Sequence, residues 1–239
     1  MQRENYRYMD GSEACEGVVF RNPKAASPSP VVMVCHAWAG RGAFEERKAE
    51  YLASLGYIGF AVDVYGGGRT GTTKEENSAL MTPFVQDRAR LRTRLLAAAA
   101  AASRIQGGAS TSLAAIGFCF GGLCALDLAR ANAPHVRGVA SFHGLFMPPA
   151  LGPQAPISAK VLALHGYDDP MATPEQMVGF AKEMTDAKAD WEVCAYGRTM
   201  HAFTNPEAND PSFGTMYSAQ ADRRSFARLE DFLAEVFAR

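Results

Sequence analysis

Cys119 lies at the centre of the segment GFCFGG, residues 117–122, which directly follows the apolar run at residues 113–116. In such a segment a strand turns abruptly into a helix with the central side chain at the apex, and the flanking glycines are needed because a β-carbon there would clash. The turn also places the sulfur beside a helix N-terminus, whose free N–H groups and dipole favour a negative charge. This pattern indicates a nucleophile elbow that carries a thiol and helps to activate it.

A buried, inert cysteine in a tight packing turn is the alternative interpretation of this segment, because free cysteine is among the most buried residue types. Partners elsewhere in the chain distinguish the two interpretations. A thiol nucleophile needs a base and a group that orients the base, and one known arrangement has them in the chain order nucleophile, acid, histidine. Residues of both types follow Cys119 in that order.

The candidate acids are Asp168 and Asp169, which follow the short apolar run at residues 160–164. The segment TPEQ, residues 173–176, then marks a helix start, with threonine as N-cap, proline at the first helical position and glutamine three residues after the cap. Both carboxylates are therefore expected on a turn at a strand end. The candidate base is His201, which follows a further strand-like segment and lies on a loop before the last helix.

Each of these residues also has a purely structural interpretation. Asp-Asp-Pro is a common turn sequence, and a lone histidine in a loop is more often a solvated surface residue than a base. All three groups, however, follow predicted strands in the order that a nucleophile, acid and histidine triad requires. The sequence therefore predicts that Cys119, one of the two aspartates and His201 form a catalytic triad.

These segments resemble the dienelactone hydrolase family, and the resemblance extends over almost the whole chain. It is carried by GFCFGG at residues 117–122, HGYDDP at 165–170, HAF at 201–203 and AVDVYG at 61–66. The resemblance implies a hydrolase that cleaves ester or lactone bonds of a small molecule through a thioester acyl-enzyme. It implies Cys119 as nucleophile, Asp169 as the orienting acid and His201 as base. Asp168 is then a structural neighbour.

Two backbone N–H groups are expected to form the oxyanion hole. In folds of this kind one belongs to the residue after the nucleophile and the other to the loop after the third strand, which here implies Phe120 and Ala37. The second assignment follows from the apolar strand at residues 31–35, which leads into that loop. The side chains expected to line the substrate pocket are His36, Trp38, His143 and Phe203.

The sequence departs from the family pattern at positions that contact substrate. Well-known members resemble this chain but carry a glutamate where His36 stands and an arginine where Asn205 stands. Arg69 is the one possible substitute for the arginines that hold the substrate carboxylate in those members. An anionic dienelactone would then lack its bidentate clamp. We therefore expect ester or lactone hydrolysis without naming the substrate.

Strand-like and helix-like segments alternate along the chain, with glycine and proline at the junctions, which is typical of a mostly parallel sheet with helices on both faces. Together with the resemblance, this predicts an α/β-hydrolase fold. The 239 residues, 48% of them hydrophobic, suit a single domain over residues 1–239. The segments 66–83, 144–158 and 203–218 each follow a strand, so we expect them to form the cap and the pocket walls.

A helix is expected to begin at Thr82-Pro83 and to continue through the alanine run at residues 97–102. Four arginines interleave with its inward-facing leucines: Arg88, Arg90, Arg92 and Arg94. Because alternating positions spread around a helix, we interpret these arginines as a solvated surface and not as an anion-binding face.

Charge and the first residues limit the classes of partner. The formal net charge of -1 gives no electrostatic reason to bind nucleic acid or an anionic membrane surface. The chain begins without an apolar signal core, and no later run reaches the roughly 18 apolar residues of a spanning helix. We therefore expect a cytoplasmic protein whose partner is a small ester or lactone, and we leave open whether it is a monomer or a homodimer.

Five cysteines, an odd number in a chain of this size, favour reduced thiols over a disulfide framework. Cys124 lies about one helical turn beyond Cys119 and is either a core residue or a resolving thiol. We interpret Cys15, Cys35 and Cys194 as core residues.

Two other functions remain as alternatives. The residues that could suggest a metal site are His36, His143, His165, Asp169 and His201. No local His-x-His or His-Glu-x-x-His spacing supports such a site, so we expect neither a metal nor a cofactor. The second alternative is a non-catalytic ligand-binding or thiol-sensing module on the same fold, because a fold alone does not establish catalysis.

Overall fold

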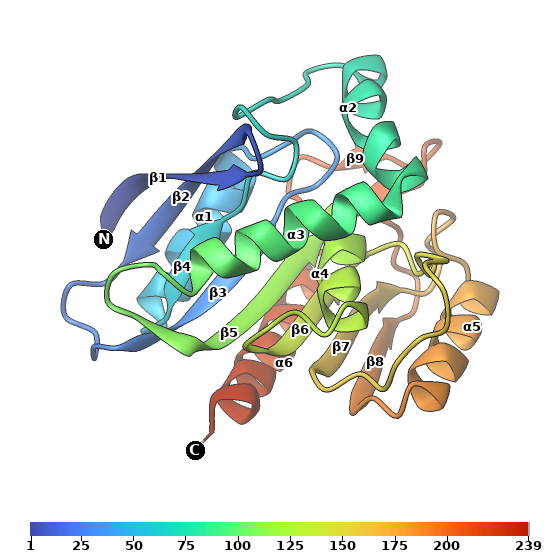
Figure 1. Ribbon diagram of the computed structural model, residues 1–239. Coiled ribbons are helices and arrows are strands. Elements are labelled where there is room, and N and C mark those ends of the chain that lie inside the picture. Colours follow the sequence, from blue (N-terminus) through green and yellow to red (C-terminus); the bar gives the residue numbers. More distant parts are fainter. Residues whose placement is uncertain (239) are drawn as a thin grey trace.

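A computed structural model describes residues 1–238, in which helices cover both faces of a central sheet (Figure 1). The strands of that sheet are β1 (Gln2–Asp10), β2 (Glu13–Arg21), β3 (Ser29–Cys35), β4 (Ile58–Ala61), β5 (Gly108–Phe118), β6 (Val136–Phe142), β7 (Lys160–Gly166) and β8 (Trp191–Tyr196). Their spatial order is β1-β2-β4-β3-β5-β6-β7-β8. β2 pairs antiparallel with both of its neighbours, and all other neighbours are parallel. A separate short hairpin consists of β9 (Asn209–Asp210) and β10 (Thr215–Met216).

Six helices complete the described part of the chain: α1 (Ala43–Ser54), α2 (Lys74–Gln86), α3 (Arg88–Ala102), α4 (Phe120–Arg130), α5 (Pro174–Asp186) and α6 (Ala219–Phe237). α1 and α6 pack their apolar side chains against one face of the sheet. α3, α4 and α5 cover the other face. None of the helices in residues 1–238 is both long enough and apolar enough to cross a membrane.

The parallel strands form because their sequences are nearly continuous apolar runs that are buried on both faces. The stretch from Leu113 to Phe118 in β5, for example, is buried at every residue. Connections between parallel strands return over the sheet, so the carboxyl ends of β3, β5, β6, β7 and β8 meet along one edge. The predicted fold class, a mostly parallel sheet with helices on both faces, is confirmed.

The helix expected to begin at Thr82-Pro83 begins elsewhere. Pro83 lies inside α2, whose N-cap is Thr73. The Thr73 side chain accepts a hydrogen bond from the backbone N–H of Glu76, and the Glu76 carboxylate accepts one from the backbone N–H of Thr73. α3 is a second helix that Asp87 caps by accepting a hydrogen bond from the Arg90 N–H at 2.9 Å. The segment 66–83 was expected to be a loop, but its second half is helical, because the cap at Thr73 starts α2 before Pro83 is reached.

The interpretation of the α3 arginines as a solvated surface is wrong for two of them. Arg88 is 7% exposed and Arg94 is 1% exposed. Arg88 holds both carboxylate oxygens of Asp127, at 2.8 and 2.6 Å, and Arg94 binds Asp10 at 2.7 Å. Positions 88, 91, 94 and 95 follow the three- and four-residue spacing of one helix face, so both arginines lie on the side that packs inward.

Candidate active site

Cys119 occupies the tight turn between β5 and α4 in a strained backbone conformation. Its φ of 56° and ψ of -116° are unfavourable for a residue with a β-carbon. A β-carbon at Gly117 would lie 1.9 Å from the carbonyl oxygen of Gly121, and one at Gly121 would lie 2.1 Å from that of Cys35. The turn predicted from the sequence is present, and it can form only because glycine stands at these two positions.

Asp169 and His201 meet at the carboxyl edge of the sheet, although 32 residues separate them along the chain. Asp169 follows β7 and His201 follows β8, and both side chains are almost fully buried. The His201 Nδ1 lies 2.7 Å from Oδ2 of Asp169. The other carboxylate oxygen of Asp169 accepts a hydrogen bond from the Met171 N–H at 2.8 Å. The carboxylate is therefore fixed and in turn fixes the ring of His201.

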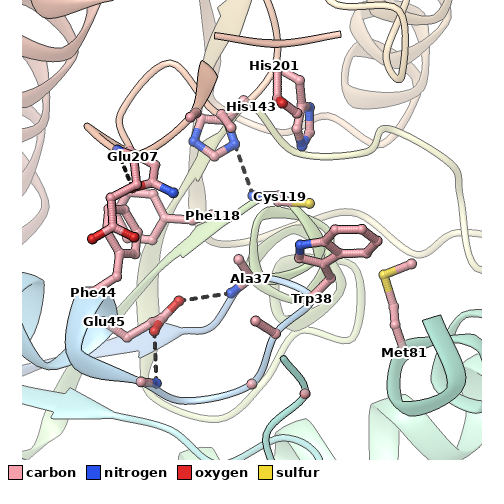
Figure 2. A pocket seen from close by; sticks show the side chains of 18 of the residues that line it. Ala37, Trp38, Phe44, Glu45, Met81, Phe118, Cys119, His143, His201 and Glu207 are labelled. Atoms are coloured by element: carbon pink, nitrogen blue, oxygen red, sulfur yellow. Dashed lines mark hydrogen bonds between the residues drawn. The ribbon is translucent and has the colours of Figure 1, made fainter. Parts of the chain in front are cut away.

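The second ring nitrogen of His201 is oriented toward the thiol. Nε2 has no hydrogen-bond partner in residues 1–238, and the sulfur of Cys119 projects toward this ring (Figure 2). Burial alone would lower the pKa of His201, but the charges of Cys119 and Asp169 outweigh burial and raise the pKa to about 10. The arrangement favours an imidazolium next to the sulfur.

His143 contacts the backbone of the turn at Cys119. It follows β6, and its Nδ1 accepts a hydrogen bond from the Cys119 N–H at 3.2 Å (Figure 2). Because Nδ1 accepts, the ring proton lies on Nε2, which donates to Oγ1 of Thr204 at 2.9 Å. Burial holds the pKa of His143 well below its usual range. His143 is therefore a neutral side chain that links the turn at Cys119 to the loop that follows His201.

The β9–β10 hairpin holds the backbone of His201. The His201 N–H donates to the carbonyl of Gly214 at 3.0 Å, and the Met216 N–H donates to the carbonyl of His201 at 3.0 Å. At the tip of the hairpin, Phe213 stacks on Trp38, with the ring centroids 5.7 Å apart. The hairpin thus connects the candidate base to the opposite wall of the site. The sequence analysis did not identify this hairpin, because two-residue strands leave no hydrophobic periodicity.

A cavity of about 760 Å³ opens above Cys119 and His201. Its apolar walls include Trp38, Phe44, Met81, Leu145, Met171 and Phe213. Three of the residues expected at the pocket or the oxyanion hole, Ala37, Trp38 and His143, line it. Cavities of this size and polarity are typical of small-molecule sites.

The comparison with protein families agrees with this geometry. The model of the dienelactone hydrolase family matches residues 16–237. The chain belongs to the dienelactone hydrolase family. It is accordingly a hydrolase that acts on carboxylic ester or lactone bonds.

Individual relatives cover most of the chain. The crystal structure of a dienelactone hydrolase-like promiscuous phosphotriesterase from metagenomic libraries is 32% identical, with a TM-score of 0.93 over 99% of both chains. A putative carboxymethylenebutenolidase of Yersinia pestis is 27% identical over 87% of this chain and 79% of its own length. A probable 2-oxo-3-(5-oxofuran-2-ylidene)propanoate lactonase of Bradyrhizobium sp is 25% identical over 76% of both chains.

Two residues expected to line the pocket of this dienelactone hydrolase family member do not line it. His36 is fully buried: its Nε2 accepts from the Val64 N–H at 3.2 Å, and its Nδ1 lies 2.7 Å from the Ala37 carbonyl oxygen. Burial lowers the pKa of His36 to about 4, so the ring is a neutral link between two strand ends. Phe203 is also fully buried and packs edge-on against His143. A position after a strand does not determine which way the side chain points.

The expected oxyanion-hole donors differ in their present partners. Phe120 opens α4, so its N–H is among the helix N-terminal donors that have no acceptor within the helix. The Ala37 N–H, in contrast, donates to Oε1 of Glu45 at 3.1 Å (Figure 2). Glu45 lies in the first turn of α1, is 4% exposed and lines the same cavity. The sequence analysis missed it because a glutamate three residues after Gly42 has the spacing of an ordinary helix cap.

The expected substitute for the family's arginine clamp lies elsewhere. Arg69 bonds to the Gly66 carbonyl at 3.0 Å and to Glu13 at 3.1 Å, and it is not part of the cavity wall. Asn205, where well-known family members carry an arginine, does line the cavity. The lining residue with a permanent positive charge is Arg47, which is exposed on α1.

The other cysteines and His165 lie outside the cavity wall. Cys15 and Cys35 are buried as expected, but Cys194 is only half-buried, because it lies on β8 at the edge of the sheet. Cys124 lies on α4 and is fully buried in the core. Burial raises its pKa well above the usual range, which favours a core residue over a resolving thiol. His165 is buried against the ring of Phe146. In residues 1–238 no three histidine, cysteine, aspartate or glutamate side chains are grouped so that they could hold a metal ion.

Proposed function

We propose that this protein hydrolyses an ester or lactone of a small molecule, with Cys119 as nucleophile, His201 as base and Asp169 as the acid that orients the base. The observation that carries the proposal is the position of His201. One ring nitrogen is fixed by Asp169 at 2.7 Å, while the other has no hydrogen-bond partner in the described residues and faces the thiol at the apex of a strained turn. A histidine that is held on one side and faces the thiol on the other can take up the thiol proton and pair with the resulting thiolate, as a thiol nucleophile requires.

In the first half of the reaction the sulfur of Cys119 attacks the carbonyl carbon and the carbonyl electron pair moves to oxygen. The N–H of Phe120, joined by that of Ala37, stabilises this oxyanion. The tetrahedral intermediate then collapses: the bond to the leaving oxygen breaks, and His201 gives that oxygen its proton. The product of this half is a thioester on Cys119 and a free alcohol, or for a lactone the opened chain.

In the second half a water molecule loses a proton to His201 and attacks the thioester carbonyl. The carbon–sulfur bond breaks, the acid leaves, and the thiolate and imidazolium are restored. Esters are better substrates than amides for this chemistry, because a thiolate leaves a tetrahedral intermediate more readily than an amine does. Peptidase activity is therefore not proposed.

The cavity suggests the substrate class. Aromatic and thioether side chains such as Trp38 and Met81 suit a planar, apolar acyl or alkoxy group. The names of two relatives, a carboxymethylenebutenolidase and a lactonase, support an unsaturated lactone as substrate. Arg47 at the rim can attract one anionic group but, without a buried arginine beside it, does not form a bidentate clamp. The cytoplasmic location expected from the sequence stays a prediction.

The test is pre-steady-state hydrolysis of p-nitrophenyl acetate by the native protein and by Cys119→Ala. We expect a burst of nitrophenol equal to the enzyme concentration in the native protein and none in the variant. Cys194→Ala is the matched control, because Cys194 is the other partly exposed thiol in the described residues and should leave the burst intact. Equal bursts in native protein and Cys119→Ala would refute the nucleophile. A reactive Cys119 without turnover on any ester would favour the non-catalytic thiol-sensing module.

A further inference from the structure

The side chain of Glu45 connects two backbone N–H groups at the edge of the cavity (Figure 2). Oε1 accepts from the Ala37 N–H at 3.1 Å, and Oε2 accepts from the Gly42 N–H at 2.9 Å. Ala37, Glu45 and Cys119 all line the same cavity. One of the two donors expected to stabilise the oxyanion is therefore bonded to a carboxylate in the resting protein.

The two oxygens of Glu45 serve separate purposes. The bond from Gly42 to Oε2 closes the capping box at the start of α1. The same cap is made at α5 by Gln176, which has a single acceptor oxygen, at 2.9 Å from the Thr173 N–H. One side-chain oxygen is thus sufficient for a capping box in this protein. The bond from Ala37 to Oε1 is not needed for the cap and requires another explanation.

The electrostatic surroundings of Glu45 make its contact with Ala37 reversible. Glu45 forms no salt bridge within residues 1–238, and nearby Arg41 instead pairs with Glu46 at 2.6 Å. Burial raises the pKa of Glu45, since the charged carboxylate loses its hydration and backbone N–H groups offset only part of that loss. A neutral carbonyl oxygen competes weakly with a carboxylate for an N–H donor, whereas a fully charged oxyanion competes on similar terms.

We propose that Glu45 is a positioning residue of the oxyanion hole, which holds the Ala37 N–H in the resting enzyme and releases it as negative charge develops on the substrate oxygen. The exchange makes the Ala37 contact specific to the transition state, because the ground-state carbonyl does not displace the carboxylate. It also predicts that the native carboxylate slows acylation, since its bond to Ala37 must break first. This inference rests on the proposed function.

Glu45→Gln separates the cap from the contact with Ala37. The amide oxygen can keep the cap, as Gln176 does at α5, and a neutral amide holds the Ala37 N–H less strongly than a carboxylate does in either orientation. The matched control is Glu76→Gln, which changes the equivalent capping glutamate of α2 outside the cavity wall. The measurement is the acylation rate constant of p-nitrophenyl acetate at neutral pH, together with thermal unfolding.

We expect Glu45→Gln to accelerate acylation about tenfold, the rate equivalent of one charge-assisted hydrogen bond, while Glu76→Gln matches the native protein. An unchanged or slower acylation in a folded Glu45→Gln protein would overturn the inference and leave Glu45 as a helix cap. If Glu45→Gln does not fold, Glu45→Asp provides the same comparison, because the shorter side chain can still cap α1 but does not span to Ala37. The absence of a burst in the native protein would instead contradict the proposed function.

Discussion

The Nδ1 atom of His201 lies 2.7 Å from Oδ2 of Asp169, and both side chains are at most 2% exposed. The pair is therefore shielded from water, and its hydrogen bond determines which ring nitrogen of His201 faces the thiol. Asp168, the preceding residue, is exposed. Adjacent carboxylates at the same strand end thus have different environments, which gives a direct test of the triad.

Asp169→Asn should lower kcat/KM by about a thousandfold, because an amide can donate to Nδ1 and stabilise the wrong tautomer of His201. Asp168→Asn makes the same chemical change one residue away, on an exposed side chain, and should leave kcat/KM within about twofold. Steady-state hydrolysis of an aryl ester by both variants is the measurement. Comparable losses in the two variants would show that the acid has been assigned to the wrong residue.

The raised pKa of His201 predicts an imidazolium that persists to high pH. Burial opposes the charge, but Cys119 and Asp169 raise the pKa from 6.5 to about 10. The protonated His201 ring therefore stabilises the folded protein fully below about pH 6.5. This stabilisation is lost as the pH rises through about 10, because the folded state then releases a proton that the unfolded state has already lost.

A titration of the His201 ring by NMR measures this pKa directly. Cys119→Ala removes the larger of the two favourable charges, so we expect the pKa to fall in that variant. The control is Cys194→Ala. The Cys194 thiol lies on β8 and does not contribute to the raised pKa of His201, so His201 in this variant should titrate as in the native protein. An identical titration in Cys119→Ala and native protein would mean that the sulfur does not carry the charge proposed for it.

The hydrogen bonds of His143 predict a stability effect at Thr204. Its hydroxyl accepts the Nε2 proton of His143, whose other nitrogen accepts from the Cys119 N–H. Thr204→Val keeps the shape but leaves a buried N–H without a partner, which should lower the free energy of unfolding by about 1–3 kcal/mol. Thr204→Ser keeps the hydroxyl and should recover most of that loss. Urea unfolding of the three proteins is the measurement, and a Thr204→Val protein as stable as the native one would contradict the predicted role of the hydroxyl.

The sequence allowed the fold, the turn at Cys119 and the meeting of Asp169 with His201 to be predicted, because all three depend on local patterns. The glycines around Cys119 are required by a turn, and the position of Asp169 and His201 after apolar strands is sufficient to bring them to one edge of a parallel sheet. The direction in which a side chain points after a strand depends instead on its tertiary contacts. His36 also follows a strand, yet its ring turns inward to the Val64 N–H and not into the cavity.

Two other features that sequence reasoning missed, the role of Glu45 and the burial of Arg94, depend on tertiary contacts. Glu45 has the spacing of a helix cap, and its second contact, to Ala37, becomes visible only when the loop after β3 is in place. The buried position of Arg94 likewise depends on Asp10, 84 residues away in β1. In both cases a charged side chain is buried because tertiary contacts supply its hydrogen-bond partners. The local sequence gives no sign of those partners.

Gly214 provides a test of the hairpin that holds His201. Its φ is +86°, and a β-carbon there would lie 2.2 Å from Cγ of Pro170, the residue after Asp169. Gly214→Ala should therefore displace the hairpin from the acid loop and weaken the bond from the His201 N–H to the Gly214 carbonyl. Because a small misplacement of a catalytic group is costly, we expect kcat/KM to fall by about a hundredfold with an aryl ester.

The control for this substitution is Gly152→Ala. Gly152 also has a positive φ, of +100°, but a β-carbon there would meet nothing within 4 Å. Both variants bear the backbone strain of alanine in the left-handed region, about 1–2 kcal/mol, so they should lose similar stability from that source. A much larger loss of activity in Gly214→Ala would isolate the contact with Pro170 as the cause. Equal activity in the two variants would mean that the hairpin does not position His201, and that Asp169 alone is sufficient to hold the ring.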